Sequence, residues 1–382
     1  MTSEEGSFAQ KTIAERKPSI INQLLADYDY TPTIRQLLID FKNEIAKSQI
    51  HELQENTNDS IIWEQELKPW SGKTWFEIPW LLAEAYFYRR VLKITGYFQP
   101  GPYMGIDPFQ RLKTNEMLDG LAVFEEIYPI LEKLTTQECF SAFCNKALWG
   151  NRGDLSHTQD SLDPSMETQS HRIILDDTKQ AFNYLVSKQP ATIAYFFDNV
   201  GKELFFDLAL IDFLLDSGLG GKVTCYLKNQ PFFVSDAMPK DLFKTIDLMT
   251  VSNDPSIQQL AKRIQFGIRS ERIRIETPPF LTQPQEFHEL PGVLRTQIAG
   301  HDIAILKGDL NYRRIMGDRH WPPTTPLDAA CNYFPTTFLS LRTLKAELVV
   351  GLTNEVLEKI KSEADLEWLT NGKRGTITFY QK

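Results

Sequence analysis

Two apolar runs in this sequence lead into polar side chains that could bind a metal ion. Asp198 and Asn199 follow the run 192–197, and Asp236 comes shortly after the run 223–227. Both runs have the character of buried strands, and open α/β sheets bind ligands at the carboxyl ends of their strands. Carboxylate and amide oxygens are the ligands that Mg²⁺ and Mn²⁺ prefer. The pattern predicts a divalent metal site, although the same residues could instead cap the helices that follow.

The segment between the two runs supports this placement. Its apolar residues recur at spacings of four, three and four, as on one face of a helix: Leu204, Leu208, Ile211 and Leu215. A glycine-rich stretch at 218–221 ends the helix before the second strand. Strand, helix and strand in this order form a βαβ unit with parallel strands. Asp198, Asn199 and Asp236 are therefore expected at the same edge of the sheet.

A third apolar run, 301–307, reads as another buried strand and ends at Gly308. If a helix begins at Asp309, then Asn311, Tyr312 and Arg313 lie in its first turn, where backbone N–H groups and the helix dipole favour an anion. The guanidinium of Arg313 suits phosphate. The alternative is structural: Asp309 caps the helix, Tyr312 belongs to the core and Arg313 is solvated.

Two cations lie in the segment 337–345, which precedes a predicted strand at 346–350. Lys345 could be a surface lysine whose stem covers apolar atoms, or a point charge for a phosphoryl group. The sequence leaves both possibilities open.

Composition and charge limit the class of protein. The chain has 382 residues, 42% of them hydrophobic, a formal net charge of −9 and a pI near 5.3, so a general nucleic-acid binder is disfavoured. No apolar run is long enough to span a bilayer, and the first residues do not resemble a signal peptide, so we expect a cytoplasmic protein. The dispersed cysteines predict neither a disulfide framework nor a zinc site.

The first part of the chain differs from the rest. Apolar residues recur with helical period through 34–41, 75–92 and 117–134, and strands alternate with helices only after a helix that bears Asp176 and Asp177. We expect a helical domain over 1–165 and an α/β domain over 166–382. In the helical domain, Arg89 or Arg90 could reach over the sheet to a substrate, or both could form a solvated helix edge.

Several motifs in order resemble one known family. The motifs occupy 75–90, 148–156, 198–204, 234–236, 307–313 and 342–345. Together they resemble the metal-dependent damage-control phosphatases of the superfamily called domain of unknown function 89. The Arg342-Thr343-x-Lys345 element is typical of its sugar-phosphate phosphatase branch, which is also labelled acidic-residue methyltransferase-like. The resemblance extends from about residue 15 to Lys382.

This resemblance implies a three-layer α/β/α sandwich with a mostly parallel, Rossmann-like sheet, preceded by N-terminal helices. It also implies hydrolysis of sugar phosphates such as fructose 1-phosphate and fructose 6-phosphate, with Mn²⁺, Mg²⁺, Co²⁺ or Ni²⁺ as cofactor. By similarity, Asp198, Asn199 and Asp236 hold the metal and serve catalysis. The implied substrate-binding residues are Asp309, Leu310, Asn311, Tyr312, Arg313 and Lys345, and further candidates are Glu203, Arg89, Arg90, Asn151 and Lys307.

Two other functions are compatible with the pattern. One is a carboxyl O-methyltransferase that uses S-adenosylmethionine, but the sequence has no Gly-x-Gly-x-Gly loop after an early strand. The other is a sugar-phosphate sensor without catalysis, which has less use for a complete Asp-Asn-Asp set. For hydrolysis, direct attack by water is favoured over an aspartyl phosphate, because the sequence lacks the Asp-x-Asp signature. The oligomeric state is not predicted.

Overall fold

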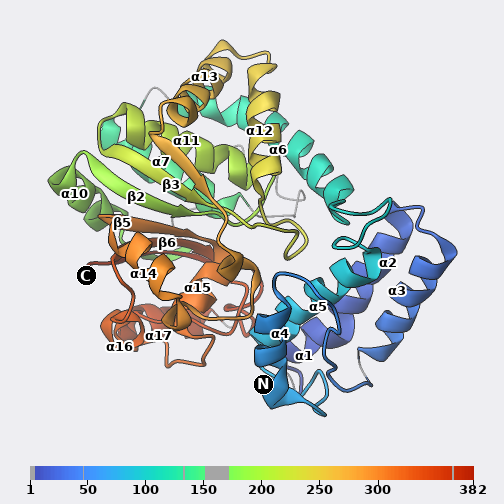
Figure 1. The fold of residues 1–382 in the computed structure, drawn as a ribbon. Coiled ribbons are helices and arrows are strands. Elements are labelled where there is room, and N and C mark those ends of the chain that lie inside the picture. Colours follow the sequence, from blue (N-terminus) through green and yellow to red (C-terminus); the bar gives the residue numbers. More distant parts are fainter. Residues whose placement is uncertain (1–4, 46, 132–133, 151–171, 364) are drawn as a thin grey trace. The chain divides into compact units, whose positions relative to one another are not determined.

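The chain forms two compact units, which are described separately (Figure 1). The computed structural model describes residues 5–45, 47–131, 134–150, 172–363 and 365–382. The helical unit comprises Met1–Lys113 together with Lys228–Ser235 and Pro279–Gln285, and the sheet unit comprises Thr114–Leu227, Asp236–Pro278 and Glu286–Lys382. No helix among the described residues combines the length and the apolar character that crossing a membrane requires.

The helical unit is built around one buried helix. Its elements are α1 (Phe8–Lys11), the π-helix η1 (Thr12–Arg16), α2 (Lys17–Asp27), α3 (Pro32–Glu44), α4 (Ser60–Leu67), the 3₁₀ turn η2 (Lys68–Trp70) and α5 (Trp80–Thr95). α5 is buried along nearly its whole length, and Gly96 ends it with a left-handed backbone conformation. Aromatic rings fill the space between the helices: Phe41 stacks on Phe87, and Trp75 packs on Tyr86.

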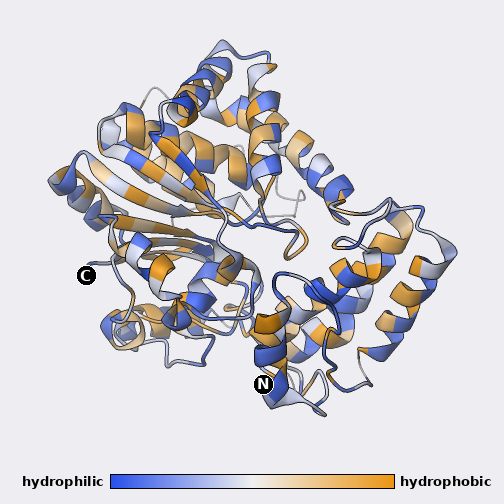
Figure 2. Cartoon of the chain, in the orientation of Figure 1, coloured by the Kyte–Doolittle hydropathy of each residue, from blue (hydrophilic) through white to orange (hydrophobic). Residues whose placement is uncertain are grey.

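The sheet unit holds a seven-stranded sheet with the order β1-β7-β6-β5-β2-β3-β4. Its strands are β1 (Ile173–Asp176), β2 (Ala191–Phe196), β3 (Gly220–Tyr226), β4 (Ile273–Glu276), β5 (Ile303–Lys307), β6 (Thr337–Thr343) and β7 (Gly375–Tyr380). Every neighbouring pair is parallel except β6 and β7. Hydrophobic residues concentrate on the central strands, which lie between helices on both faces (Figure 2). The predicted α/β class with a mostly parallel sheet and N-terminal helices is confirmed.

The strand order reverses direction between β2 and β5. From β2 the chain passes through α11 (Lys202–Asp216) to β3 on one side, and from β5 it passes through α15 (Gly308–Met316) toward β6 on the other. Because such crossovers are right-handed, α11 and α15 cover opposite faces of the sheet, as Figure 1 shows. The remaining helices of this unit are α6 (Gln110–Leu131), α7 (Thr136–Trp149), α10 (Thr178–Lys188), α12 (Pro239–Thr250), α13 (Pro255–Arg269), η5 (Phe287–Glu289), α14 (Gly292–Ala299), α16 (Leu327–Cys331) and α17 (Asn354–Ser362). Helix α6 begins in the helical unit, and the 3₁₀ turn η4 (Pro279–Thr282) lies wholly in the helical unit.

Helices α6 and α7 pack with the sheet unit because two glycines allow a very close approach to α11. A Cβ atom on Gly120 would lie 2.5 Å from the backbone nitrogen of Lys202, and one on Gly150 would lie 2.4 Å from Cα of Glu203. With these contacts the sheet unit begins at Thr114, whereas the sequence led us to expect a boundary near residue 165. Residue 165 itself lies outside the described residues.

Two local predictions were wrong. The segment before α10 contains strand β1, whose short and partly exposed sequence resembled the amphipathic helix beside it. Residues 346–350 are a loop, and the strand there is 337–343. Side chains hold this loop: the Arg342 guanidinium donates to the carbonyl oxygens of Leu348 and Ala346, and the Val350 amide donates to the Tyr312 hydroxyl.

Candidate active site

The three predicted metal ligands lie together where the strand order reverses. Asp198 and Asn199 follow β2, and Asn199 forms an isolated antiparallel bridge with Asp236. The backbone N–H of Ala237 donates to the carbonyl oxygen of Asp198 at 2.8 Å. All three side chains are buried. This reversal point is where open α/β sheets form their ligand crevices.

The amide of Asn199 has a defined orientation. Its Nδ2 donates to Asp198 Oδ2 at 2.7 Å and to Glu203 Oε2 at 3.3 Å. Since both neighbours are carboxylates, which only accept when ionised, the hydrogen-bond pattern assigns the nitrogen to this side. The carbonyl oxygen of the amide is therefore the end that can act as a ligand.

Gly308 lets the start of α15 approach Asp198. Its φ is +81°, and a Cβ atom there would lie 1.9 Å from Asp198 Oδ2. Any other residue would both strain this backbone and displace the carboxylate. The glycine between β5 and α15 thus shapes the cradle around Asp198.

Lys307, the last residue of β5, forms a buried ionic network with α11. Its Nζ lies 2.7 Å from Glu203 Oε1 and 2.7 Å from Asp207 Oδ1, and the Tyr195 hydroxyl donates to Asp207 Oδ1 at 2.7 Å. Burial alone would lower the pKa of Lys307, but the charges of Asp207 and Glu203 outweigh it and raise that pKa. Lys307 is therefore a fixed, charged part of the interior.

Asp207 in this network is a weaker acid than an exposed aspartate. Burial raises its pKa, Lys307 opposes the shift and Glu203 adds to it, so that the pKa is about 7. The interior thus holds more acidic groups than the single lysine can neutralise.

Asp309, in the first turn of α15, is held by two guanidinium groups. Its Oδ2 accepts from Arg313 Nε at 2.9 Å and its Oδ1 accepts from Arg342 Nε at 2.7 Å. Burial would raise the pKa of Asp309, but Arg342 and Arg313 outweigh it and lower that pKa. The carboxylate stays charged, and each of its oxygens keeps the capacity for a further hydrogen bond.

The other predicted substrate residues of α15 make contacts of their own. Asn311 Nδ2 donates to the carbonyl oxygen of Lys307 at 2.8 Å, and the Tyr312 ring lies 4.1 Å under the Arg342 guanidinium. Leu310 is buried. Lys345 is half-buried in the loop after β6.

The sequence reasoning missed two buried arginines. Arg342 was visible in the Arg-Thr-x-Lys element, yet only Lys345 was chosen from it. Arg314 is fully buried, and burial lowers its pKa to about 10 against the opposing charge of Asp236. Its signal was the adjacent pair Arg313-Arg314, of which only the first was selected.

Arg89 and Arg90 make their contacts inside the helical unit. Arg89 donates from Nε to Asp59 Oδ2 and from Nη1 to Glu55 Oε2, both at 2.8 Å. Arg90 donates to the Tyr86 hydroxyl at 3.1 Å, and its guanidinium lies over Phe41. Asn151 lies outside the described residues.

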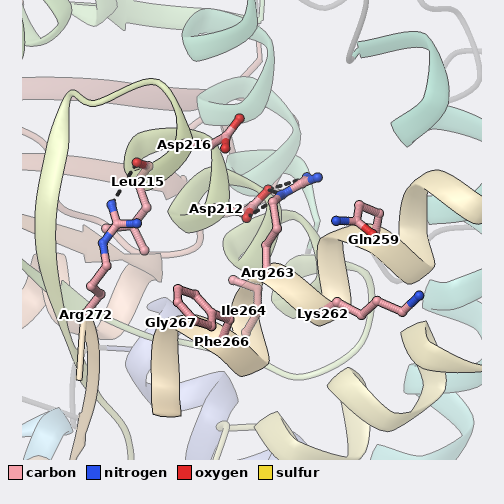
Figure 3. A pocket seen from close by; sticks show the side chains of 10 residues that line it. All are labelled: Asp212, Leu215, Asp216, Gln259, Lys262, Arg263, Ile264, Phe266, Gly267 and Arg272. Carbon is pink, nitrogen blue, oxygen red and sulfur yellow. Dashed lines mark hydrogen bonds and ion pairs between the residues drawn. The ribbon is translucent and has the colours of Figure 1, made fainter. Parts of the chain in front are cut away.

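Two cavities of the sheet unit lie elsewhere. Figure 3 shows one of about 310 Å³, lined by α11, α13 and the start of β4, in which Arg263 Nη2 binds Asp212 Oδ2 at 2.6 Å. Another, of about 260 Å³, is lined by residues of α7, β1 and α10. None of the predicted site residues lines either cavity.

The donor set at the sheet edge fits a hard divalent cation. Arg313 and Arg342 pair with Asp309 and Asp318, so the four buried carboxylates of Asp198, Asp236, Glu203 and Asp207 share two further buried cations, Lys307 and Arg314. Within the described part of the chain, no three His, Cys, Asp or Glu side chains form a metal-binding group. The predicted ligand set consists of two carboxylates and one amide, which could bind such a cation through their oxygens. A cation bound this way would complete its coordination with water or substrate, as Mg²⁺ commonly does.

A comparison with solved structures shows the fold to which the chain is similar. A DUF89 family protein from Pyrococcus horikoshii is similar in structure, with a TM-score of 0.52, 16% sequence identity and 97% coverage of both chains. This likeness shows that the two proteins share a fold.

The sequence then defines the family. Residues 12–360 match the profile of the damage-control phosphatase ARMT1-like domain, and the chain belongs to this family. It is 30% identical to damage-control phosphatase ARMT1 of Danio rerio, over 98% of this chain and 95% of the relative, and 28% identical to that of Mus musculus, over 98% and 97%. The resemblance inferred from the motifs is confirmed, and the family is metal-dependent.

Proposed function

We propose that this protein is a metal-dependent phosphomonoester hydrolase that acts on sugar phosphates, with fructose 1-phosphate and fructose 6-phosphate as first candidates. The observation that carries the proposal is the convergence of Asp198, Asn199 and Asp236 at the reversal point of the sheet. Homology to damage-control phosphatases supports the reaction class.

In this proposal Asp198, Asn199 and Asp236 hold the metal, which when bound supplies positive charge for the phosphoryl group and for an attacking water. Phosphoryl transfer depends mainly on positioning and on charge neutralisation, so few covalent steps are required of the protein. Direct attack by water is the proposed route.

Substrate recognition is assigned to the first turn of α15 and to the loop after β6. Asp309, fixed by Arg313 and Arg342, accepts a hydrogen bond from a sugar hydroxyl, and Asn311 lies in the same turn. Lys345 provides a point charge for the phosphate. Backbone N–H groups at the start of α15 add to the favourable field for an anion.

The test is phosphate release by chelator-stripped protein from ketose, aldose and nucleotide phosphates, with Mg²⁺, Mn²⁺, Co²⁺ or Ni²⁺ added back singly. We expect metal-dependent release from ketose phosphates, a loss of at least about a thousandfold in Asp198→Ala, and mainly a higher KM in Lys345→Ala. Asp212→Asn, also a buried carboxylate of this unit, is the matched control. Silence with every metal and substrate, or full turnover in Asp198→Ala, would refute the proposal.

A further inference from the structure

The buried charges behind the metal ligands form one continuous chain of contacts. It runs from Asp198 through the Asn199 amide to Glu203, then through Lys307 to Asp207, and ends at the Tyr195 hydroxyl. Each link measures between 2.7 and 3.3 Å. Three elements contribute to it: β2 with the turn after it, α11, and the end of β5.

Glu203 bridges two different partners with its two oxygens. Oε2 accepts from the Asn199 amide, and Oε1 accepts from Lys307. Lys307 is itself held between Glu203 and Asp207, so it cannot move toward one carboxylate without leaving the other. The Glu203 carboxylate is therefore fixed in position by these two contacts, with Oε2 placed to accept the Asn199 amide hydrogen.

Together with Asp198, the fixed Glu203 side chain holds the Asn199 nitrogen and so sets which end of the amide faces a cation. If Glu203 became a neutral amide, its side chain could donate as well as accept, and only Asp198 would still require the Asn199 nitrogen on its side. A flipped Asn199 would present an NH₂ group to the cation. Groups behind metal ligands commonly control ligand orientation in this way, and their loss typically costs about 10–100-fold in metal affinity.

We propose that Glu203, Lys307 and Asp207 are positioning residues whose network keeps the carbonyl oxygen of Asn199 available as a metal ligand. None of them touches the substrate in this assignment, so Lys307 is a structural cation and not a phosphate-binding one. The inference rests on the metal site of the proposed function.

The test uses the metal alone. Mn²⁺ is titrated into chelator-stripped full-length protein, and free Mn²⁺ is measured by its electron paramagnetic resonance signal. We expect Glu203→Gln to weaken binding by about 10–100-fold and Asp207→Asn to weaken it less, because Asp207 acts only through Lys307. Asp212→Asn removes a buried carboxylate charge on the same helix, α11, away from the network, and should bind Mn²⁺ as the wild type does.

Thermal unfolding of each variant separates positioning from folding. A Glu203→Gln protein that melts like Asp212→Asn but binds Mn²⁺ weakly supports the inference. Wild-type affinity in Glu203→Gln overturns it, as does a larger loss in Asp207→Asn than in Glu203→Gln. If Glu203→Gln fails to fold, Asp207→Asn decides alone: an unchanged Mn²⁺ affinity in that variant overturns the network.

The result is distinguishable from failure of the proposed function. If the wild type binds Mn²⁺ and Glu203→Gln does not, but no phosphate is released from any substrate, the network stands and the phosphatase assignment falls. If the wild type binds no divalent cation, both fall together.

Discussion

Both units of this protein bury charged side chains, but the ratio of buried cations to buried carboxylates differs between two such groups. In the helical unit, Lys17 pairs with Glu84 and Lys113 pairs with Asp107, one cation to one carboxylate, all fully buried. Phe87 and Tyr88 lie against the Lys17 ammonium. At the sheet edge, apart from the ion pairs that Arg313 and Arg342 form with Asp309 and Asp318, four buried carboxylates accompany two buried cations. A balanced pair is complete in itself, whereas an excess of buried carboxylates requires a further positive charge. The comparison teaches that a balanced buried pair is structural, whereas unpaired carboxylates gathered at the carboxyl ends of strands point to a bound cation.

After the loss expected in Asp198→Ala, the largest expected effect comes from blocking the candidate metal site without changing any charge. Gly308→Ala places a methyl group 1.9 Å from Asp198 Oδ2, and displacing that carboxylate should lower phosphate release by at least about a hundredfold. Gly218→Ala is the control, because its φ of +78° is similar but nothing lies within 4 Å of the added carbon. That variant should lose about 1 kcal/mol of stability and keep its activity. Equal losses of activity in the two variants would contradict the role given to Gly308.

Removing charges from both regions sharpens the comparison further. Lys17→Met should cost about 3–5 kcal/mol in the free energy of unfolding, because Glu84 is left buried and unpaired, and adding Glu84→Gln should recover most of it. Neutralising the network with Lys307→Met, Glu203→Gln and Asp207→Asn should likewise leave a folded protein, but one that binds Mn²⁺ weakly. Urea unfolding and Mn²⁺ titration measure the two properties. Normal Mn²⁺ binding in the triple variant would contradict this prediction, because the network would then be as purely structural as the Lys17–Glu84 pair.

The smallest expected effect is a pH dependence of stability, and it comes from Lys17 in the helical unit. Burial lowers the pKa of Lys17 to about 8, with Glu84 opposing the shift, whereas an unfolded lysine titrates near 10.5. Between these values the unfolded chain binds more protons, so the contribution of Lys17 to stability rises with pH from about 8 to 10.5. The difference in unfolding free energy between wild type and Lys17→Met, measured by urea unfolding across this window, should shift in favour of the wild type. A flat or falling difference would show that the lysine is not perturbed as described.

Much of the sheet unit could be predicted because its signals are local. The buried strands β2, β3 and β5 are continuous apolar runs, and glycines mark the turns after α11 and before α15. Strand β1 was missed because it is short and partly exposed. The packing of α6 and α7 on α11 could not be predicted, because Gly120 and Gly150 reveal their packing role only once α11 is beside them.

The types of the candidate site residues could be predicted from the sequence, but the contacts between them could not. Asp198, Asn199 and Asp236 were predicted as ligands because they follow strands, and the structure brings them close together. The bond between Lys307 and Glu203 joins residues 104 positions apart, and no local pattern records such a contact. Arg342 was overlooked for the same reason, since its partner Asp309 lies 33 positions earlier.

The route of the chain has a consequence for biosynthesis. The helical unit includes Lys228–Ser235 and Pro279–Gln285, and Phe233 stacks on Tyr88 within it. When a ribosome has released the first 113 residues, this unit still lacks both segments. It can be completed only after residue 285 has emerged, by which time β1 to β4 have also been made. The N-terminal helices therefore reach their complete packing only after residues made much later have joined them, which differs from the usual order in which the N-terminal part of a protein folds first.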